Sequence, residues 1–281
     1  MAGNLSLLLK SFLALGIAAT ACSQNIADSI ETSDRLQQLP VQTIIPTTFF
    51  SKFVSDSIRL DISLPASYNQ DTTKIYPVIY LTDEYWRRDA HEIIHDMSQE
   101  KELPEVIIVG IGYPDGYDFN TIRVRDLVEN ADMFLTCIKD EIIPYVEKTY
   151  RAANLKRTLW GASLGGYFII YAFTEHIKVG KLFTNYIGAS VVLNPRFEHV
   201  DLLKNEQLLW ETTRELPVNL YLTVGELEDR SMIKSYTQIA DAIYSHDYKK
   251  LRFEYEIIPE KDHITVWKPS LLGGLRKFLN D

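Results

Sequence analysis

The residues best suited to covalent chemistry lie around Ser163, in the segment Gly161-Ala-Ser-Leu-Gly165. A strand-like run, Thr158 to Trp160, precedes this segment, and an apolar helical pattern begins at Leu164. The pattern predicts a tight turn between a strand and a helix, in which only small flanking residues allow the two elements to approach closely. Such a turn would raise the serine hydroxyl above the edge of a sheet, where it can act as a nucleophile.

A serine hydroxyl needs a base to become reactive at neutral pH, and His263 is the best candidate. It follows the predicted strand Phe253 to Ile258 and precedes the last predicted helix. By contrast, His176, His199 and His246 lie near predicted helix ends, so we expect them at the surface.

An acid that orients the histidine should follow the preceding strand, Val218 to Val224. Glu226, Glu228 and Asp229 all occur there. Each of them could instead place negative charge at the start of the next helix. The residues alone therefore leave the choice among the three open. The chain order serine, acid, histidine is that of the α/β-hydrolase fold, which uses no cofactor.

Eight strand-like runs alternate with amphipathic helical patterns, which predicts one α/β domain built on a mostly parallel sheet with helices on both faces. The first two strands should form an antiparallel hairpin around residues 55–57. The segment Asn194 to Pro217 is either a small helical flap or a surface helix. The predicted strands are Phe50 to Val54, Ile58 to Leu64, Val78 to Leu81, Val106 to Gly110, Thr158 to Trp160, Tyr186 to Ala189, Val218 to Val224 and Phe253 to Ile258. The predicted helices are Asp89 to Lys101, Val124 to Thr149 with a kink or end at Pro144, Leu164 to His176, Ile233 to Ser245 and Pro269 to Leu279.

The amino-acid composition excludes some classes of binding partner and structural site. The 281 residues are 46% hydrophobic and carry a formal charge of −9, so a phosphate backbone would be repelled and we expect no nucleic-acid partner. Two cysteines are too few for a disulfide framework or a structural zinc site. The composition does not predict an oligomeric state.

The N-terminal residues have the pattern of an export signal. Lys10 is followed by a short apolar run and by small residues before Cys22, as in a bacterial lipoprotein signal, although Ala19 stands where a leucine is usual. We therefore expect a signal peptide over residues 1–21, lipid on Cys22, a polar tether over 22–40 and the hydrolase domain over 41–281. The expected location is the cell envelope, in the periplasm or at the outer membrane, with attachment to a membrane only through the lipid. Plain secretion and a permanent membrane helix remain the alternatives.

A second motif, His91-Glu92-Ile-Ile-His95, matches a zinc-peptidase pattern in which two histidines hold the metal and the glutamate activates water. The motif lies in a helix expected between two strands, and the nearby Glu100, Glu102 and Glu105 are too close to provide a third ligand from another helix. An ordinary amphipathic helix is the simpler interpretation, and we expect no metal.

Five segments together resemble the esterase D family of α/β-hydrolases, which includes carbohydrate and feruloyl esterases, siderophore esterases, S-formylglutathione hydrolase and mycolyltransferases. The likeness extends from about Phe49 to Phe278. The segments are Tyr76-Pro-Val-Ile-Tyr-Leu-Thr-Asp83, Ile107-Ile-Val-Gly-Ile-Gly112, Trp160-Gly-Ala-Ser-Leu-Gly-Gly166, Val224-Gly-Glu-Leu-Glu228 and His263-Ile-Thr-Val-Trp-Lys-Pro269.

The resemblance implies roles for further residues. It favours Glu228 as the acid, although some similar siderophore esterases work with serine and histidine alone. Leu164 would give one N–H to an oxyanion hole by its position after the serine. Tyr85 would give the other, although Glu84 replaces the glycine usual in relatives.

Three further residues are candidates for contacting the substrate, which would be a small-molecule or carbohydrate ester. Trp86 and Trp267 could form aromatic walls of the site, and Arg123 could anchor a substrate or form a structural salt bridge. A ligand-binding lipoprotein that has lost catalysis is the alternative from another functional class.

Overall fold

The computed structural model describes residues 44–83, 88–193 and 201–280. The expected signal peptide, Cys22 and the tether lie outside these ranges, as do Tyr85 and Trp86. Among the described residues, no helix has the length and apolar character needed to cross a bilayer.

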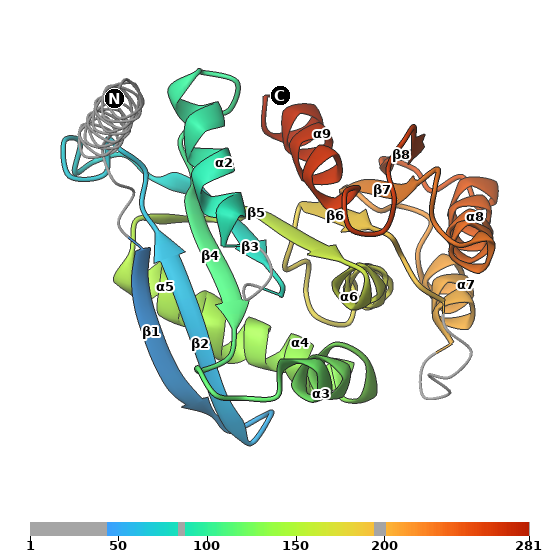
Figure 1. Ribbon diagram of the computed structural model, residues 1–281, viewed down its shortest axis with the longest axis horizontal. Helices are drawn as coiled ribbons and strands as arrows, with labels where there is room; N and C mark the ends of the chain where they lie inside the picture. Colours follow the sequence, from blue (N-terminus) through green and yellow to red (C-terminus); the bar gives the residue numbers. More distant parts are fainter. Residues whose placement is uncertain (1–43, 84–87, 194–200, 281) are drawn as a thin grey trace, which may run out of the picture. The chain divides into compact units, whose positions relative to one another are not determined.

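The fold is built on an eight-stranded sheet with the order β1-β2-β4-β3-β5-β6-β7-β8 (Figure 1). β1 pairs antiparallel with β2, and β2 pairs antiparallel with β4. The remaining neighbours are parallel, so the carboxyl ends of β3 to β8 lie at one edge of the sheet. The strands are β1 Ile44–Ser51, β2 Asp56–Ser63, β3 Tyr76–Leu81, β4 Ile107–Gly112, β5 Ala152–Ala162, β6 Asn185–Ala189, β7 Asn219–Gly225 and β8 Arg252–Ile258.

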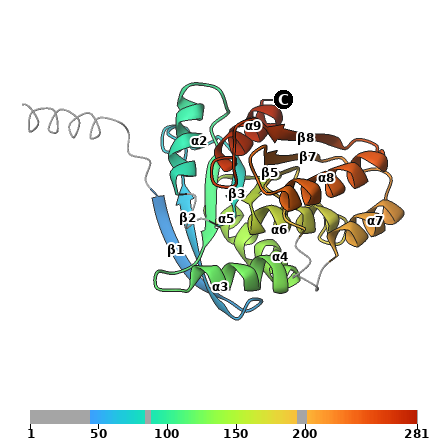
Figure 2. The same ribbon diagram turned by 45° about the vertical axis from the view of Figure 1, so that its right-hand side comes forward.

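Helices cover both faces of the sheet, as Figures 1 and 2 show, with α2 and α9 on one side and α4 and α6 on the other. The helices are α2 Asp89–Gln99, α3 Phe119–Val124, α4 Ala131–Cys137, α5 Ile143–Thr149, α6 Leu164–Thr174, α7 Leu202–Thr212, α8 Arg230–Ser245 and α9 Trp267–Leu279, with π-helical turns η2 Arg125–Glu129 and η3 Ile138–Ile142.

The central strands are apolar on both faces because each face is buried under helices. In β3, Val78 and Tyr80 join the larger core beneath α4 to α8, whereas Ile79 and Leu81 join a second core beneath α2 and α9. The predicted class, a mostly parallel α/β sheet with an N-terminal antiparallel hairpin, is confirmed.

Several predicted elements differ from the structure. β5 begins at Ala152, six residues earlier than expected. β1 begins six residues earlier than expected, and the hairpin turn lies at residues 52–55. The strand contains Pro46, which an edge strand tolerates because one side of it makes no ladder hydrogen bonds. The single helix expected over 124–149 is a series of short helices with π turns at η2 and η3, and Pro144 lies in the first turn of α5.

Candidate active site

Ser163 lies at the sharp turn between β5 and α6. Its backbone angles are φ 60° and ψ −117°, a combination that costs energy for any residue with a side chain. Hydrogen bonds hold it there: the Ser163 N–H donates to the carbonyl of Ala189 at 2.9 Å, and the Ser163 carbonyl accepts from the Tyr167 N–H at 2.9 Å. The strain is therefore compensated by β6 and by the first turn of α6.

The two glycines of the motif are required by close packing. A Cβ on Gly161 would lie 2.6 Å from the backbone carbonyl of Gly165, and a Cβ on Gly165 would lie 2.5 Å from Oγ1 of Thr82. Real Cβ atoms essentially never make such contacts, so neither position accepts a side chain without movement of the turn. The glycines thus allow β5, α6 and the end of β3 to meet beneath Ser163.

His263 contacts the serine directly, with Nε2 lying 3.1 Å from the Ser163 Oγ. It belongs to the loop between β8 and α9, 100 positions further along the chain. The carboxylate of Asp262 fixes this loop by accepting hydrogen bonds from the N–H groups of Ile264 at 3.0 Å and Thr265 at 2.9 Å. The imidazole is therefore held in a position to accept the proton of the serine.

Of the three acidic candidates, Glu228 is the one that reaches His263. Its Oε2 lies 3.0 Å from Nδ1 of His263, and its side chain is fully buried. Glu226 instead accepts from the N–H of Glu260, and Asp229 caps α8 by accepting from the N–H of Ser231. The geometry thus separates carboxylates that the sequence alone left equivalent.

Glu228 stays ionised in this buried position. Burial alone would raise its pKa, but the hydrogen bonds from His263, Gly225 and Ser190 outweigh this effect and hold the pKa below its ordinary value. A carboxylate at Oε2 favours the His263 tautomer with the proton on Nδ1. In this tautomer, Nε2 is an acceptor that faces the hydroxyl of Ser163.

Ser190 is a site residue that sequence reasoning missed. It directly follows β6, is buried, and donates from its Oγ to Oε1 of Glu228 at 2.7 Å. The N–H of Gly225 donates to the same oxygen at 2.8 Å. The position of Ser190 directly after a central strand was the available signal in the sequence, because the carboxyl ends of neighbouring parallel strands meet at one edge.

Leu164 is the first residue of α6, so its N–H lies among the N-terminal amides that have no acceptor within the helix. The partial positive charge at this helix terminus suits an oxyanion. The second expected donor, Tyr85, lies outside the described residues.

Arg123 forms a two-point ion pair with Asp83, the residue two positions after β3. Nη2 lies 2.6 Å from Oδ2 and Nε lies 3.1 Å from Oδ1, with both side chains largely buried. Asp83 has a left-handed backbone with φ 60°. The pair thus joins α3 to the strand end that precedes Tyr85, which is the structural salt bridge considered for Arg123 from the sequence.

Trp267, the other described candidate for substrate contact, is the first residue of α9. It is half-buried and packs edge-on against Trp160, with ring centroids 6.1 Å apart. It therefore contributes to the core beneath α9.

The zinc-like motif lies on α2, as an amphipathic helix would place it. His91 is buried, and its Nδ1 lies 2.6 Å from the Ser63 Oγ. Within the described ranges, no three histidine, cysteine or acidic side chains are arranged to hold a metal ion.

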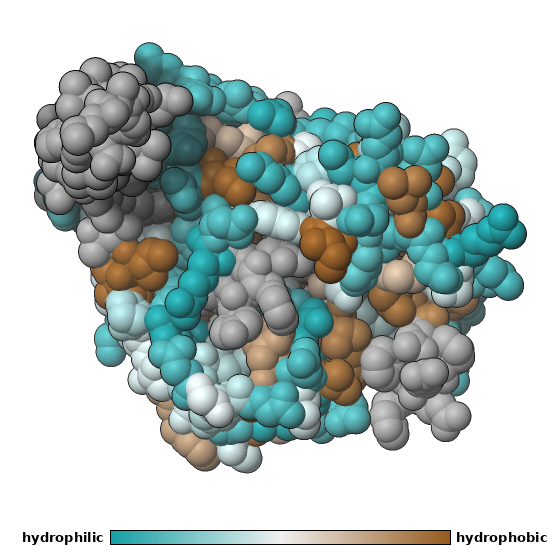
Figure 3. All heavy atoms as spheres, in the orientation of Figure 1, coloured by the Kyte–Doolittle hydropathy of each residue, from teal (hydrophilic) through white to brown (hydrophobic). Residues whose placement is uncertain are grey.

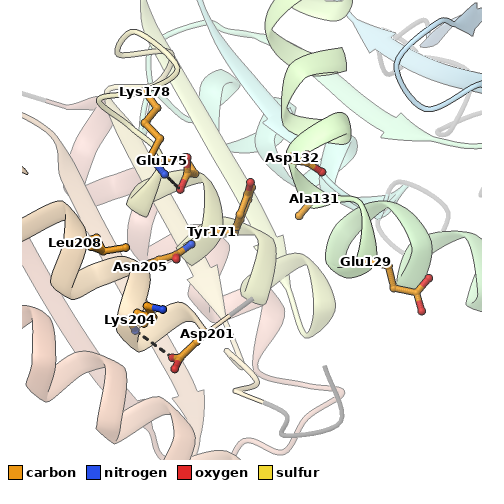
Figure 4. A pocket seen from close by; sticks show the side chains of 10 residues that line it. All are labelled: Glu129, Ala131, Asp132, Tyr171, Glu175, Lys178, Asp201, Lys204, Asn205 and Leu208. Atoms are coloured by element: carbon orange, nitrogen blue, oxygen red, sulfur yellow. Dashed lines mark hydrogen bonds and ion pairs between the residues drawn. The ribbon is translucent and has the colours of Figure 1, made fainter. Parts of the chain in front are cut away.

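A cavity of about 640 Å³ opens at some distance from these residues, between η2, α4, α6 and α7 (Figure 4). Its lining includes Glu129, Tyr171 and Asp201, and none of Ser163, Glu228 and His263 borders it. On the face drawn in Figure 3, hydrophilic side chains predominate and hydrophobic ones form small, separate patches. The cavity therefore does not mark the position of Ser163, which follows from the strand ends.

Known proteins share both the sequence pattern and the fold. Residues 51–278 match the model of the family described as "Putative esterase". The ferri-bacillibactin esterase BesA of Bacillus subtilis (strain 168) is 26% identical over 235 aligned positions, covering 72% of this chain and 78% of the relative.

Two solved structures have the same fold. The BES protein from Bacillus cereus superimposes with a TM-score of 0.72 at 24% identity, covering 85% of this chain and 97% of the other. An IroE-like serine hydrolase from Shewanella oneidensis superimposes with a TM-score of 0.75 at 22% identity, and the match covers 85% of this chain and 80% of the other. Because the family model spans most of the sequence, the chain belongs to the putative esterase family and is a carboxylic ester hydrolase.

Proposed function

We propose that this chain is a serine esterase that works through an acyl-enzyme. The observation that carries the proposal is the unbroken hydrogen-bonded series from the Ser163 Oγ to Nε2 of His263, and from Nδ1 of His263 to Oε2 of Glu228. In this role the serine oxygen attacks the ester carbonyl carbon while His263 accepts the hydroxyl proton. Glu228 stabilises the resulting imidazolium.

The tetrahedral intermediate carries negative charge on the former carbonyl oxygen. We assign its stabilisation to the N–H groups of Leu164 and Tyr85, each worth about 3 kcal/mol of barrier. When the intermediate collapses, the ester C–O bond breaks and the leaving alkoxide takes the proton from His263. Water then gives a proton to His263, attacks the acyl-enzyme, and releases the acid while Ser163 recovers its proton.

Hydrolysis of a p-nitrophenyl ester series tests this proposal. The wild-type chain should hydrolyse short esters, and Ser163→Ala should lower kcat at least about a thousandfold. Ser67→Ala provides a matched control, because Ser67 bonds to Glu105 at the other end of the sheet. If no ester is hydrolysed in a serine-dependent way, the alternative of a ligand-binding lipoprotein is favoured. Activity that survives Ser163→Ala but is lost on chelation would favour the zinc alternative.

For the substrate, we propose a siderophore ester, with carbohydrate-linked and aryl esters as the other classes to test. The support is the name of the 26% identical relative, a ferri-bacillibactin esterase. The test is to measure kcat/KM for a siderophore trilactone, a feruloyl ester and an acetyl-xylan ester. The proposal predicts the highest value for the trilactone, and a clear preference for either other class would overturn it.

We also propose that residues 1–21 direct export and that Cys22 receives lipid. The support is the basic, apolar and small-residue pattern that ends at the cysteine. Incorporation of radiolabelled palmitate into the expressed protein should disappear in Cys22→Ser and persist in Cys137→Ser, because Cys137 is buried in the core. Unlabelled wild-type protein recovered from the medium would instead support plain secretion.

A further inference from the structure

The last strand, β8, forms one edge of the sheet and pairs with β7 alone in the described part of the chain. The N–H of Arg252 donates to the Val218 carbonyl, and the carbonyl of Ile258 accepts from the Glu226 N–H. Backbone groups alternate in direction along a strand, so those of Phe253, Tyr255 and Ile257 point away from the sheet. This outward row is a ready template for another strand.

The side chains on this edge are unusually apolar for a solvent-facing strand. Tyr255 is 44% exposed and Ile257 is 47% exposed. On the same face, Phe253 stacks on Tyr255 with ring centroids 5.4 Å apart, and Tyr244 of α8 meets Tyr255 at 6.3 Å while remaining 71% exposed. A cavity of about 400 Å³ lies beside the strand and is bordered by Phe253 and Tyr244. This aromatic surface could be buried by a partner.

The opposite face of β8 carries charged side chains at every second position, namely Arg252, Glu254 and Glu256. Arg252 lies 3.2 Å from Glu254, Lys277 of α9 contacts Glu254, and Tyr221 donates to Glu256 at 2.6 Å. These groups remain where they are when a strand is added at the edge. They therefore determine which strand can lie opposite without bringing like charges together.

The charges select one arrangement of two copies of the strand. An antiparallel pair with its two-fold axis at Tyr255 would place Glu254 opposite Glu256 twice. An axis at Glu254 would place Arg252 opposite Glu256 twice but would also place Glu254 opposite itself. An axis at Phe253 places Arg252 opposite Glu254 twice, which is favourable, and pairs Phe253 with its own copy. The strand is therefore self-complementary in charge and in apolar contact in this register.

We propose that the chain forms a symmetric dimer through antiparallel pairing of β8 about Phe253, joining the two sheets into one. Leu251 then lies opposite Tyr255, and the outward N–H and carbonyl groups of residues 251, 253 and 255 of each copy bond to those of the other. The contact is isologous and closes after two copies, so it covers the first part of the exposed edge without creating a fibre. The dimer does not depend on ester hydrolysis.

Sedimentation velocity of the full chain at increasing concentration tests the proposal. The wild-type protein should show a dimer of twice 32.3 kDa. Tyr255→Lys and Arg252→Glu should each shift the dimer toward monomer by at least about tenfold in dissociation constant. Leu155→Lys alters a still more exposed apolar residue, on β5, and should leave the dimer intact. Far-UV circular dichroism verifies that each variant is folded.

Single cysteines determine the register. In a Cys22→Ser background, Phe253→Cys should form a disulfide-linked dimer under mild oxidation, because the residue faces its own copy, whereas Glu254→Cys and Tyr255→Cys should not. A wild-type protein that stays monomeric would overturn the proposal. A dimer that survives both Tyr255→Lys and Arg252→Glu, or that cross-links through position 254 or 255, would overturn it equally.

Discussion

Glu228 is the residue whose function depends most on its surroundings, because a buried carboxylate needs partners to remain charged. It has three, His263, Ser190 and the Gly225 N–H, and the pKa of the carboxyl group is lowered as a result. Since these partners stabilise the charged form, the group is suited to counter the positive charge that the proposed mechanism places on His263.

Removing the charge of Glu228 should impair catalysis, whereas removing the charge of a neighbouring acid should have little effect. We expect Glu228→Gln to lower kcat about 10³- to 10⁴-fold, because the imidazole loses both its preferred tautomer and its counter-charge. Asp229→Asn is the matched control: the residue is exposed and caps α8, and kcat should change less than about threefold. Steady-state kinetics on one p-nitrophenyl ester compares the two. Similar kcat for Glu228→Gln and wild type would mean that serine and histidine work as a dyad.

His176 is a buried residue that we expected at the surface from its position near a helix end. It is only 1% exposed, and its Nδ1 lies 3.0 Å from the hydroxyl of Tyr186. Burial, with a smaller contribution from Lys181, lowers its pKa to about 4. The folded protein therefore keeps this imidazole neutral at a pH where the unfolded chain would protonate it.

The stability of the protein should reflect this difference. The folded pKa is depressed below the unfolded value of about 6.5, so stability is fully present above pH 6.5 and declines as the pH falls toward about 4. Between pH 7.5 and pH 5, the free energy of unfolding should decrease by about 2 kcal/mol from this group. Urea unfolding of wild type and His176→Gln should differ in their pH dependence by this amount. If the unfolding free energies of the two proteins depended on pH in the same way, His176 would not be the source of the pH dependence.

At the scale of elements, the turn from β5 to α6 depends on the absence of side chains. Gly161 and Gly188 are directly opposite each other on β5 and β6, and both lie beneath helices. Their environments differ, because a Cβ on Gly161 would meet backbone whereas one on Gly188 would meet the ends of the Leu222 and Ile169 side chains.

This difference predicts unequal effects of the same substitution. Gly161→Ala should destabilise the fold by about 3 kcal/mol and lower kcat, because the backbone of Gly165 cannot yield without moving Ser163. Gly188→Ala should cost about 1 kcal/mol or less, because side-chain ends can shift. Chemical denaturation followed by fluorescence measures the unfolding free energy of both variants. Equal losses of unfolding free energy in the two variants would show that Gly161 is not more tightly packed than Gly188.

The elements that could be predicted from the sequence are those with a strong local pattern. The central strands and the helices α6 and α9 follow from apolar runs, and the serine turn follows from its two glycines. β1 was placed too late because Pro46 interrupts its pattern, and only the pairing with β2 makes it a strand. The π turns in the region 125–142 depend on packing against neighbouring helices, which a helical period does not encode.

For the molecule as a whole, the reactive group is assembled from separate strand ends. Ser163 follows β5, Ser190 follows β6, Glu228 follows β7 and His263 follows β8. The positions of the serine, the acid and the histidine after successive strands could be predicted, because parallel strands bring their carboxyl ends to one edge. The choice of Glu228 over Glu226 and the role of Ser190 could not, because both depend on side-chain directions in three dimensions.

In the proposed mechanism His263 makes Ser163 reactive, and covalent labelling of the serine can demonstrate this. A fluorophosphonate reacts with an activated serine, and mass spectrometry of the digested protein identifies the modified residue. We expect a single adduct on Ser163, with labelling at least about a hundredfold slower in His263→Ala. An adduct on another residue, or an unchanged labelling rate without the imidazole, would contradict it.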